Sequence, residues 1–183
     1  MVFIFCAGFH CFIMPNQRIL LTQSFNNFLS KFNFMRQQFK LSLSVQYASQ
    51  CKELPTRQQF RRWVRVAQQR DLHCTLRVVD EHEGRELNKD YRGKDYATNV
   101  LTFVYDDTLP LSGDIVICAP VVEAEAAAQV KQILAHYAHM TLHSTLHLQG
   151  YDHENDKDAA EMEKLESALM LNLGYPAPYD VTN

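Results

Sequence analysis

The chain has 183 residues, about the length of one domain, and 46% of them are hydrophobic, which is typical of a globular protein and excludes a disordered tail, a collagen and a disulfide scaffold. Eighteen Lys and Arg against 21 Asp and Glu give a net charge of −3, which excludes a strongly basic nucleic-acid-binding domain but not a local basic face that binds RNA. The five cysteines are odd in number and form no C-x-x-C pair, so we expect reduced thiols in a cytoplasmic protein.

The first 34 residues differ in composition from the rest. They hold eight of the eleven phenylalanines, no acidic residue and only two basic residues. Met1–Met14 lacks the basic start of a signal peptide and is followed by no small-residue cleavage site. Pro15–Arg18 interrupts the apolar run before it reaches the roughly 20 residues of a membrane span. We therefore expect residues 1–34 to be a loosely attached extension or a mis-assigned start, with Met14 or Met35 as the true beginning, and one domain over residues 35–183. A membrane or targeting role is the alternative.

The apolar pattern after residue 34 predicts one strand, one helix, three strands and three helices, in that order. Alternating apolar residues predict the first strand over Gln38–Ala48. A helix begins at Pro55-Thr56, and one face of it carries the apolar residues Phe60, Trp63, Val64 and Ala67. We expect the other strands at Thr75–Asp80, Asn99–Val104 and Asp114–Cys118.

The rest of the chain is predicted to be helical. High helix propensity extends from Ala119 to Leu148, which is long for one globular helix, so we expect a break near Gln129–Lys131. We expect Asp156 to cap a final helix that stops at Gly174. This order predicts an α+β fold in which a small mixed sheet of about four strands packs against helices.

Three histidines predict a zinc site on a helix and the loop after it. His143 and His147 are four residues apart, which places both imidazoles on one face of a helix. Gly150 can adopt the left-handed conformation that reverses the chain, so His153 can supply a third nitrogen. Three protein ligands with an open fourth position are typical of catalytic zinc, and we expect one zinc ion per chain. Ordinary surface or core histidines are the alternative.

Two neighbours of these histidines are candidates for a supporting role, in which a side chain hydrogen-bonds to a metal-binding histidine without binding the metal itself. His139 lies four residues before His143, where it either supports that ligand or simply packs. Asp152 precedes His153 and either orients an imidazole or caps the turn.

The spacing H-x-x-x-H-x-x-G-x-x-H also matches the zinc-binding frame of the metzincin proteases. Those enzymes carry Glu directly after the first histidine as the general base. Ser144 occupies that position and cannot take a proton at neutral pH, and no obvious Met-turn follows His153. A zinc protease is therefore the least favoured of the functions considered.

The histidine segment resembles the YbeY family of bacterial metal-dependent endoribonucleases. The family's H-G-x-L-H-L-x-G-Y-D-H pattern is matched over residues 143–153, except that Ser144 replaces glycine. Residues 86–103 are similar to the family's L-N-x-x-Y-R-x-K-D-x-x-T-N-V-L-S-F segment, and Gly113-Asp114-Ile115 matches its G-D-I strand. The three motifs follow the family's order, and the likeness covers roughly residues 36–178.

The resemblance implies a single-strand-specific endoribonuclease that matures the 3′ end of small-subunit ribosomal RNA and acts in ribosome quality control. It implies zinc on the three histidines and an arginine in the cleft that matters for activity, which is Arg92 by motif position. The expected partners are then single-stranded RNA and the small ribosomal subunit with its proteins, without a membrane. A ribosome-assembly factor whose metal mainly holds the fold is the alternative.

A phosphodiester bond requires a Lewis acid and a cationic group, because negative charge grows on the phosphate in the transition state. Arg92 offers planar, bidentate phosphate contacts that Lys cannot copy. Its alternative is a solvated loop arginine, since the segment from Tyr91 to Asp95 is typical of a loop. The attacking group is either zinc-bound hydroxide or the 2′-hydroxyl of the RNA.

Charge runs predict two further surfaces. The candidates for RNA contact are four basic residues, Arg57, Arg61, Arg65 and Lys94. The alternative is that they form an ordinary charged surface. The three arginines follow one another at helical spacing with no acid between them. Seven acids lie within Asp152–Glu166, where we expect a solvated helix start; a face for a basic ribosomal protein is the alternative.

Overall fold

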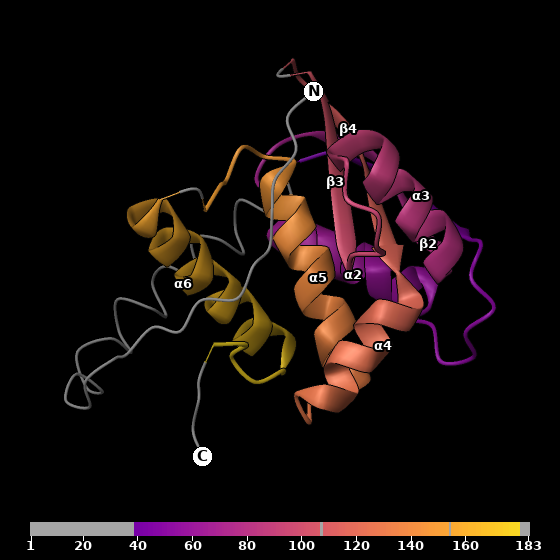
Figure 1. Cartoon of the computed structure of the whole chain (residues 1–183). Helices are drawn as coiled ribbons and strands as arrows, with labels where there is room; N and C mark the ends of the chain where they lie inside the picture. Colours follow the sequence, from indigo (N-terminus) through magenta and orange to yellow (C-terminus); the bar gives the residue numbers. More distant parts are fainter. Residues whose placement is uncertain (1–38, 107, 154, 180–183) are drawn as a thin grey trace.

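Four strands and five helices make up the part of the chain that the computed structural model describes, which is residues 39–106, 108–153 and 155–179 (Figure 1). The strands are β1 (Leu41–Tyr47), β2 (Leu72–Val79), β3 (Val100–Asp106) and β4 (Leu111–Cys118). The helices are α2 (Arg57–Ala67), α3 (Glu81–Arg92), α4 (Ala119–Ala128), α5 (Ile133–His147) and α6 (Asp156–Leu173). Residues 1–34, for which we predict an extension or a mis-assigned start, lie outside the described residues.

The sheet has the strand order β1-β2-β4-β3. β1, β2 and β4 are parallel, and β3 lies at one edge, antiparallel to β4. The predicted α+β fold with a small mixed sheet of four strands is therefore confirmed.

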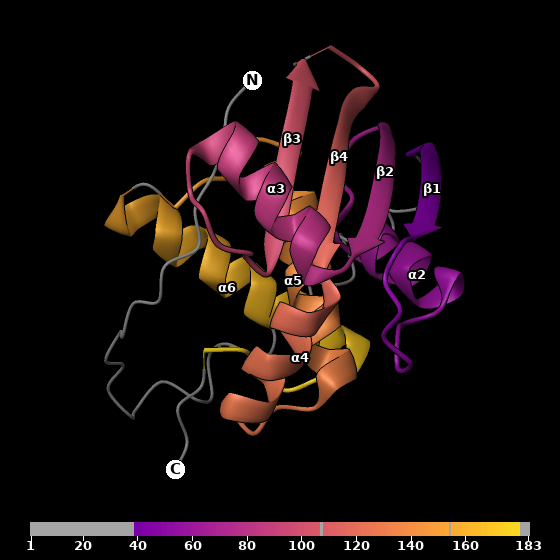
Figure 2. The same ribbon diagram turned by 45° about the vertical axis from the view of Figure 1, so that its right-hand side comes forward.

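The helices lie on both faces of the sheet. The larger hydrophobic core lies between one face and the helices α2, α5 and α6. The smaller core lies on the other face, where Leu87 of α3 and Val121 of α4 pack on side chains of β2, β3 and β4. Figure 2 shows α3 in front of the sheet and α5 behind it. Among the described helices, none combines the length and the apolar character that crossing a membrane requires.

The predicted break in the long helical segment is confirmed at Gln129–Lys131. α4 ends at Ala128 and α5 begins at Ile133, and between them Val130 adopts a positive φ of 53°. A left-handed residue cannot continue an α-helix, so the chain turns here and α5 can pack across the sheet.

One helix was missing from the prediction. α3 follows β2 directly, and Tyr91 and Arg92 are its last residues, so they do not lie in a loop as predicted. The segment is almost entirely polar and has no continuous apolar stripe. It packs through Leu87 and through Gly84, where an added Cβ would lie 3.1 Å from Sγ of Cys118. A smaller correction concerns α6, whose N-cap is Asn155 rather than Asp156, because its side chain accepts the N–H of Asp158.

Candidate metal centre

Two of the three predicted ligands, His143 and His147, lie on α5, which is buried along almost its whole length between the sheet and α6. Its two buried threonine hydroxyls do not interrupt the helix, because Thr141 and Thr145 donate to carbonyls four residues earlier at 2.8 and 2.7 Å. At the C-terminal end, Leu148 lies against Gly113 of β4. Gly150 then reverses the chain with φ 89°.

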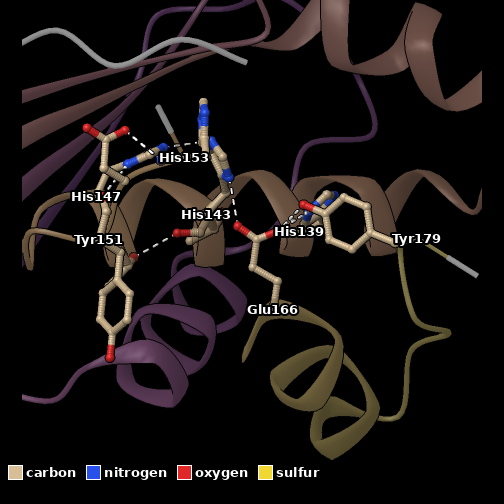
Figure 3. Close-up of polar contacts among 10 residues, drawn as sticks. His139, His143, His147, Tyr151, His153, Glu166 and Tyr179 are labelled. Atoms are coloured by element: carbon tan, nitrogen blue, oxygen red, sulfur yellow. Dashed lines mark hydrogen bonds and ion pairs between the residues drawn. The ribbon is translucent and has the colours of Figure 1, made fainter. Parts of the chain in front are cut away.

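The structure brings His143, His147 and His153 together at the end of α5 (Figure 3). One ring nitrogen from each residue lies within 4.8 Å of the others, and the Nε2 atoms of His143 and His147 are 2.9 Å apart. His143 and His147 are buried, and His153 is half-buried on the loop after the helix.

The hydrogen bonds on the far side of two of the rings decide where their protons lie. Nδ1 of His143 is 2.7 Å from Oε1 of Glu166, and Nδ1 of His147 is 2.7 Å from the carbonyl oxygen of Tyr151. Both acceptors take a proton from Nδ1, which leaves the Nε2 atom of each neutral ring with a lone pair. Burial lowers the pKa of His147 to about 3, and burial also lowers the pKa of His153.

This arrangement fits a cation. Two lone pairs face each other across 2.9 Å, and the buried Nε2 of His153 has no hydrogen-bond partner within the described residues. Neutral imidazole nitrogens are the ligands that zinc and similar divalent transition metals prefer. Three such nitrogens leave a fourth position for water or substrate.

Glu166 is a member of the site that the sequence reasoning missed. We predicted a solvated acidic segment up to this residue, but the Glu166 side chain is fully buried and binds the rings of His143 and His139. Burial alone raises its pKa, but the His143 and His139 rings and their hydrogen bonds outweigh burial and hold the pKa below its ordinary value. The available signal was its position, because Glu166 shares the apolar face of α6 with Met162, Leu165 and Leu169.

The two candidate supporting residues have different surroundings. Nε2 of His139 lies 2.8 Å from Oε2 of Glu166, so His139 touches the carboxylate that holds His143 rather than a ligand itself. Oδ1 of Asp152 accepts the main-chain N–H of His153 at 2.6 Å, which is the contact of a turn cap.

Arg92 is held at the end of α3 by the buried side chain of Asn88. Nη1 of Arg92 donates to Oδ1 of Asn88 at 3.2 Å, and Nδ2 of Asn88 donates to the carbonyl oxygen of Tyr96 at 2.7 Å. Asn88 thereby ties the arginine to the loop that follows the helix. Lys94 lies exposed in that loop, one residue after the helix-ending Gly93.

The C-terminal ends of α3, which carries Arg92, and of α5, which carries His143 and His147, lie at the same end of the sheet but on its opposite faces (Figure 1). The ring of Tyr91 packs on Phe103 of β3, with ring centroids 4.9 Å apart. The carbonyl oxygen of Phe103 lies beside Gly113, the residue that Leu148 of α5 contacts from the other face. The single layer of the sheet therefore lies between the ends of α3 and α5.

The predicted basic stripe lies beside β1, the outer strand of the sheet within the described residues. Lys40 and Ala48 bond with β2 through their main chains, so the odd-numbered residues of β1 point their main-chain groups away from the sheet. Arg61 donates to one of these outward carbonyls, that of Leu43, at 3.3 Å, and Arg65 donates at 2.7 Å to the carbonyl of Phe39, just before the strand.

The third arginine of the stripe makes a different contact. Cζ of Arg57 lies 5.0 Å from the ring centroid of Tyr47, which is the geometry of a cation–π contact. The stripe is therefore partly engaged in covering the edge of the sheet.

The chain is similar to known endoribonucleases over most of its length. The family model described as Endoribonuclease YbeY matches residues 44–174. Among curated relatives of that name, the protein of Methylobacillus flagellatus is 56% identical over 140 residues, covering 76% of this chain and 94% of the relative. The protein of Nitrosomonas europaea is 54% identical over 140 residues, covering 76% of this chain and 85% of the relative. The solution structure of TM1509 from Thermotoga maritima is 22% identical, with a TM-score of 0.48 over 72% of this chain and 91% of that one.

Proposed function

Because the chain belongs to the YbeY family of endoribonucleases, we propose that it is a zinc-dependent endoribonuclease that cuts single-stranded RNA. The observation that carries the proposal is the pair of Nε2 lone pairs of His143 and His147, 2.9 Å apart, with His153 beside them. These three residues would hold one zinc ion per chain. The chemistry that bound zinc supplies is Lewis-acid activation of the phosphate and a bound water whose pKa falls towards about 7.

The side chains around the histidines prepare them for this role. The carboxylate of Glu166 and the carbonyl of Tyr151 fix the protons of His143 and His147 on Nδ1. Because burial lowers the pKa of His147 to about 3, its ring stays neutral and available as a ligand at physiological pH. No carboxylate general base follows His143, where Ser144 stands, which supports metal-activated water or the 2′-hydroxyl of the RNA as the attacking group.

Arg92 would bind the phosphate that is cut. Its guanidinium can make two parallel hydrogen bonds to phosphate oxygens and stabilise the charge that grows in the transition state. Support comes from its bond to Asn88 and from its place on α3, whose C-terminal end lies at the same end of the sheet as that of α5. An RNA strand that reaches both groups would have to pass around the edge strand β3.

We also propose the finer biological role that the resemblance implies. The RNA would be the precursor of small-subunit ribosomal RNA, cut at its 3′ end, with a second role in ribosome quality control in the cytoplasm. The small ribosomal subunit and its proteins would be the partners. Lys94 and the stripe of Arg57, Arg61 and Arg65 are the basic residues offered for RNA contact.

A ribosome-assembly factor with a mainly structural metal is the second candidate. The burial of His143 and His147 between α6 and the sheet favours it, because a metal there would tie the loop after α5 to the core.

Cleavage of a single-stranded RNA by the zinc-loaded full-length protein tests both candidates. We expect cleavage of the single strand and little cleavage of the same sequence in a duplex. His147→Ala should abolish it, whereas His82→Ala, which removes a surface histidine, should not change it. A zinc-binding protein without activity would support the assembly factor, and equal activity in His147→Ala would show that the histidine site does not cut the RNA and overturn the proposal.

A further inference from the structure

Tyr179 brings the C-terminal segment back onto the helix that carries the histidines (Figure 3). Its hydroxyl contacts Oε2 of Glu166 and lies 3.2 Å from Nε2 of His139. Its ring meets the ring of His139 edge-on, with centroids 5.5 Å apart and an interplanar angle of 90°. Lys131 fixes the same segment to the turn before α5 by donating to the carbonyl oxygen of Pro178 at 3.3 Å.

The contacts of Glu166 divide its two oxygens between two tasks. Oε1 accepts from Nδ1 of His143 at 2.7 Å, whereas Oε2 accepts from His139 and from Tyr179. Because the side chain is fully buried, its charge has these three donors in place of water within the described residues. The donors on Oε2 therefore determine how firmly the carboxylate is held against His143.

We propose that Tyr179 is a positioning residue for the metal centre and that it acts through Glu166 on His143. Tyr179 and His139 anchor the carboxylate, and the carboxylate keeps the proton of His143 on Nδ1 and its Nε2 turned towards His147. The proposal rests on the proposed zinc site. It concerns a segment that lies beyond the family match, which ends at residue 174.

The expected consequence of losing this anchor is weaker metal binding. Without the Tyr179 hydroxyl, Oε2 keeps one donor, and the carboxylate can rotate away from His143. The His143 ring then samples the tautomer with its proton on Nε2, which cannot bind the metal through that nitrogen. Residues that orient a metal ligand in this way typically change metal affinity by about 10–100-fold. We expect a loss of that size for Glu166→Gln and a smaller loss, of about 3–10-fold, for Tyr179→Phe.

Zinc affinities of the full-length variants, measured by competition with a chelator, test the proposal. Tyr175→Phe is the matched control, because it removes a hydroxyl from the same segment while the ring stays against Trp63. The decisive measurement is the double variant: if Tyr179 acts through Glu166, Tyr179→Phe has no further effect in the Glu166→Gln protein. Unchanged affinity in Tyr179→Phe, or an equal loss in both backgrounds, would overturn the proposal.

The ring ¹⁵N chemical shifts of His143 in the metal-free protein give a second readout that needs neither zinc nor activity. We expect the Nδ1–H tautomer in the wild type and in Tyr175→Phe, and a mixture of tautomers in Tyr179→Phe. Wild-type shifts in Tyr179→Phe would exclude the positioning role even if Glu166→Gln does not fold. Absence of zinc binding by the wild type would instead refute the zinc site itself, and the shifts would still report on Tyr179.

Discussion

Leu148 packs directly against Gly113, and this contact fixes the end of α5 to the sheet. A Cβ added at Gly113 would lie 2.5 Å from Cδ2 of Leu148 and still closer to the carbonyl oxygen of Phe103. Glycine is therefore required at position 113 by close packing and not by the backbone conformation of a turn. His147 is the residue before Leu148, so the same contact sets the height of the metal centre above the sheet.

Gly113→Ala should lower the unfolding free energy by roughly 1–3 kcal/mol, because the added methyl group meets backbone that cannot move aside. It should also weaken zinc binding, since α5 must shift. Gly174→Ala is the control: its φ of 86° makes alanine unfavourable, but nothing lies within 4 Å. That variant should lose stability and keep its zinc affinity. Denaturant unfolding and zinc titration of both variants would show the difference, and normal zinc binding by Gly113→Ala would contradict it.

Arg92→Lys should keep the fold and the zinc content but lose most of the RNA-cleaving activity. The charge survives, but the planar fork that contacts two phosphate oxygens does not. Arg85→Lys provides the control on the same helix, because Arg85 pairs with Asp95 at the surface. Cleavage rates of the two variants under identical conditions decide the matter. If turnover in Arg92→Lys equals that of the wild type, Arg92 does not bind the phosphate as a bidentate group.

Arg65→Gln should lower the unfolding free energy by about 1 kcal/mol, because the carbonyl of Phe39 loses a charged donor. Arg62→Gln, on the exposed side of the same helix, should leave stability unchanged. Measurements of RNA affinity test the other proposed role of the three arginines, which is contact with RNA. If Arg57 contacts phosphates, Arg57→Gln weakens RNA binding and reduces its dependence on salt. If the salt dependence of RNA binding is unchanged, the arginines cover the edge of the sheet and do not contact phosphates.

The metal-free protein should become less stable as the pH falls below about 6.5. The pKa of His147 is about 3 in the folded chain and near 6.5 in the unfolded chain, and burial also lowers the pKa of His139. Between these values the unfolded chain binds more protons, so stability decreases on acidification, by up to about 1.4 kcal/mol per pH unit for each group. Unfolding free energies at pH 7.5 and 5.5 measure this. His147→Asn, which keeps a donor near Tyr151 but cannot titrate, should show a weaker pH dependence.

Ser144→Ala should be neutral or stabilising. Ser144 is fully buried, and its hydroxyl has no hydrogen-bond partner within the part of the chain that the structure describes. A buried unpaired hydroxyl costs about 1–3 kcal/mol, and alanine removes that cost without a change in backbone. Thr145→Ala is the contrasting variant, because its hydroxyl donates to the carbonyl of Thr141 at 2.7 Å. A marked loss of stability in Ser144→Ala would show that the hydroxyl is bonded after all.

Several features of this protein were determined by the sequence itself, because they depend on short-range geometry. The alternation of apolar residues predicted β1, and the spacing of Phe60, Trp63 and Val64 predicted the buried face of α2. The four-residue step between His143 and His147, with Gly150 after it, brings three imidazoles together through local backbone geometry alone. The one helix missed, α3, is too polar to show an apolar period, and its burial rests on Gly84 and Leu87.

Only the tertiary structure decided what surrounds those histidines. Glu166 lies 23 residues from His143 in sequence and shares no motif with it, so its place on the apolar face of α6 indicated burial but not its partner. The same holds for Tyr179 beside His139 and for Arg65 at the carbonyl of Phe39. Helical periodicity predicts on which face of a helix a side chain lies. The residue that this side chain contacts depends on how α6, the C-terminal segment and β1 pack in space. A buried charge needs such a partner, and only the packed fold provides it.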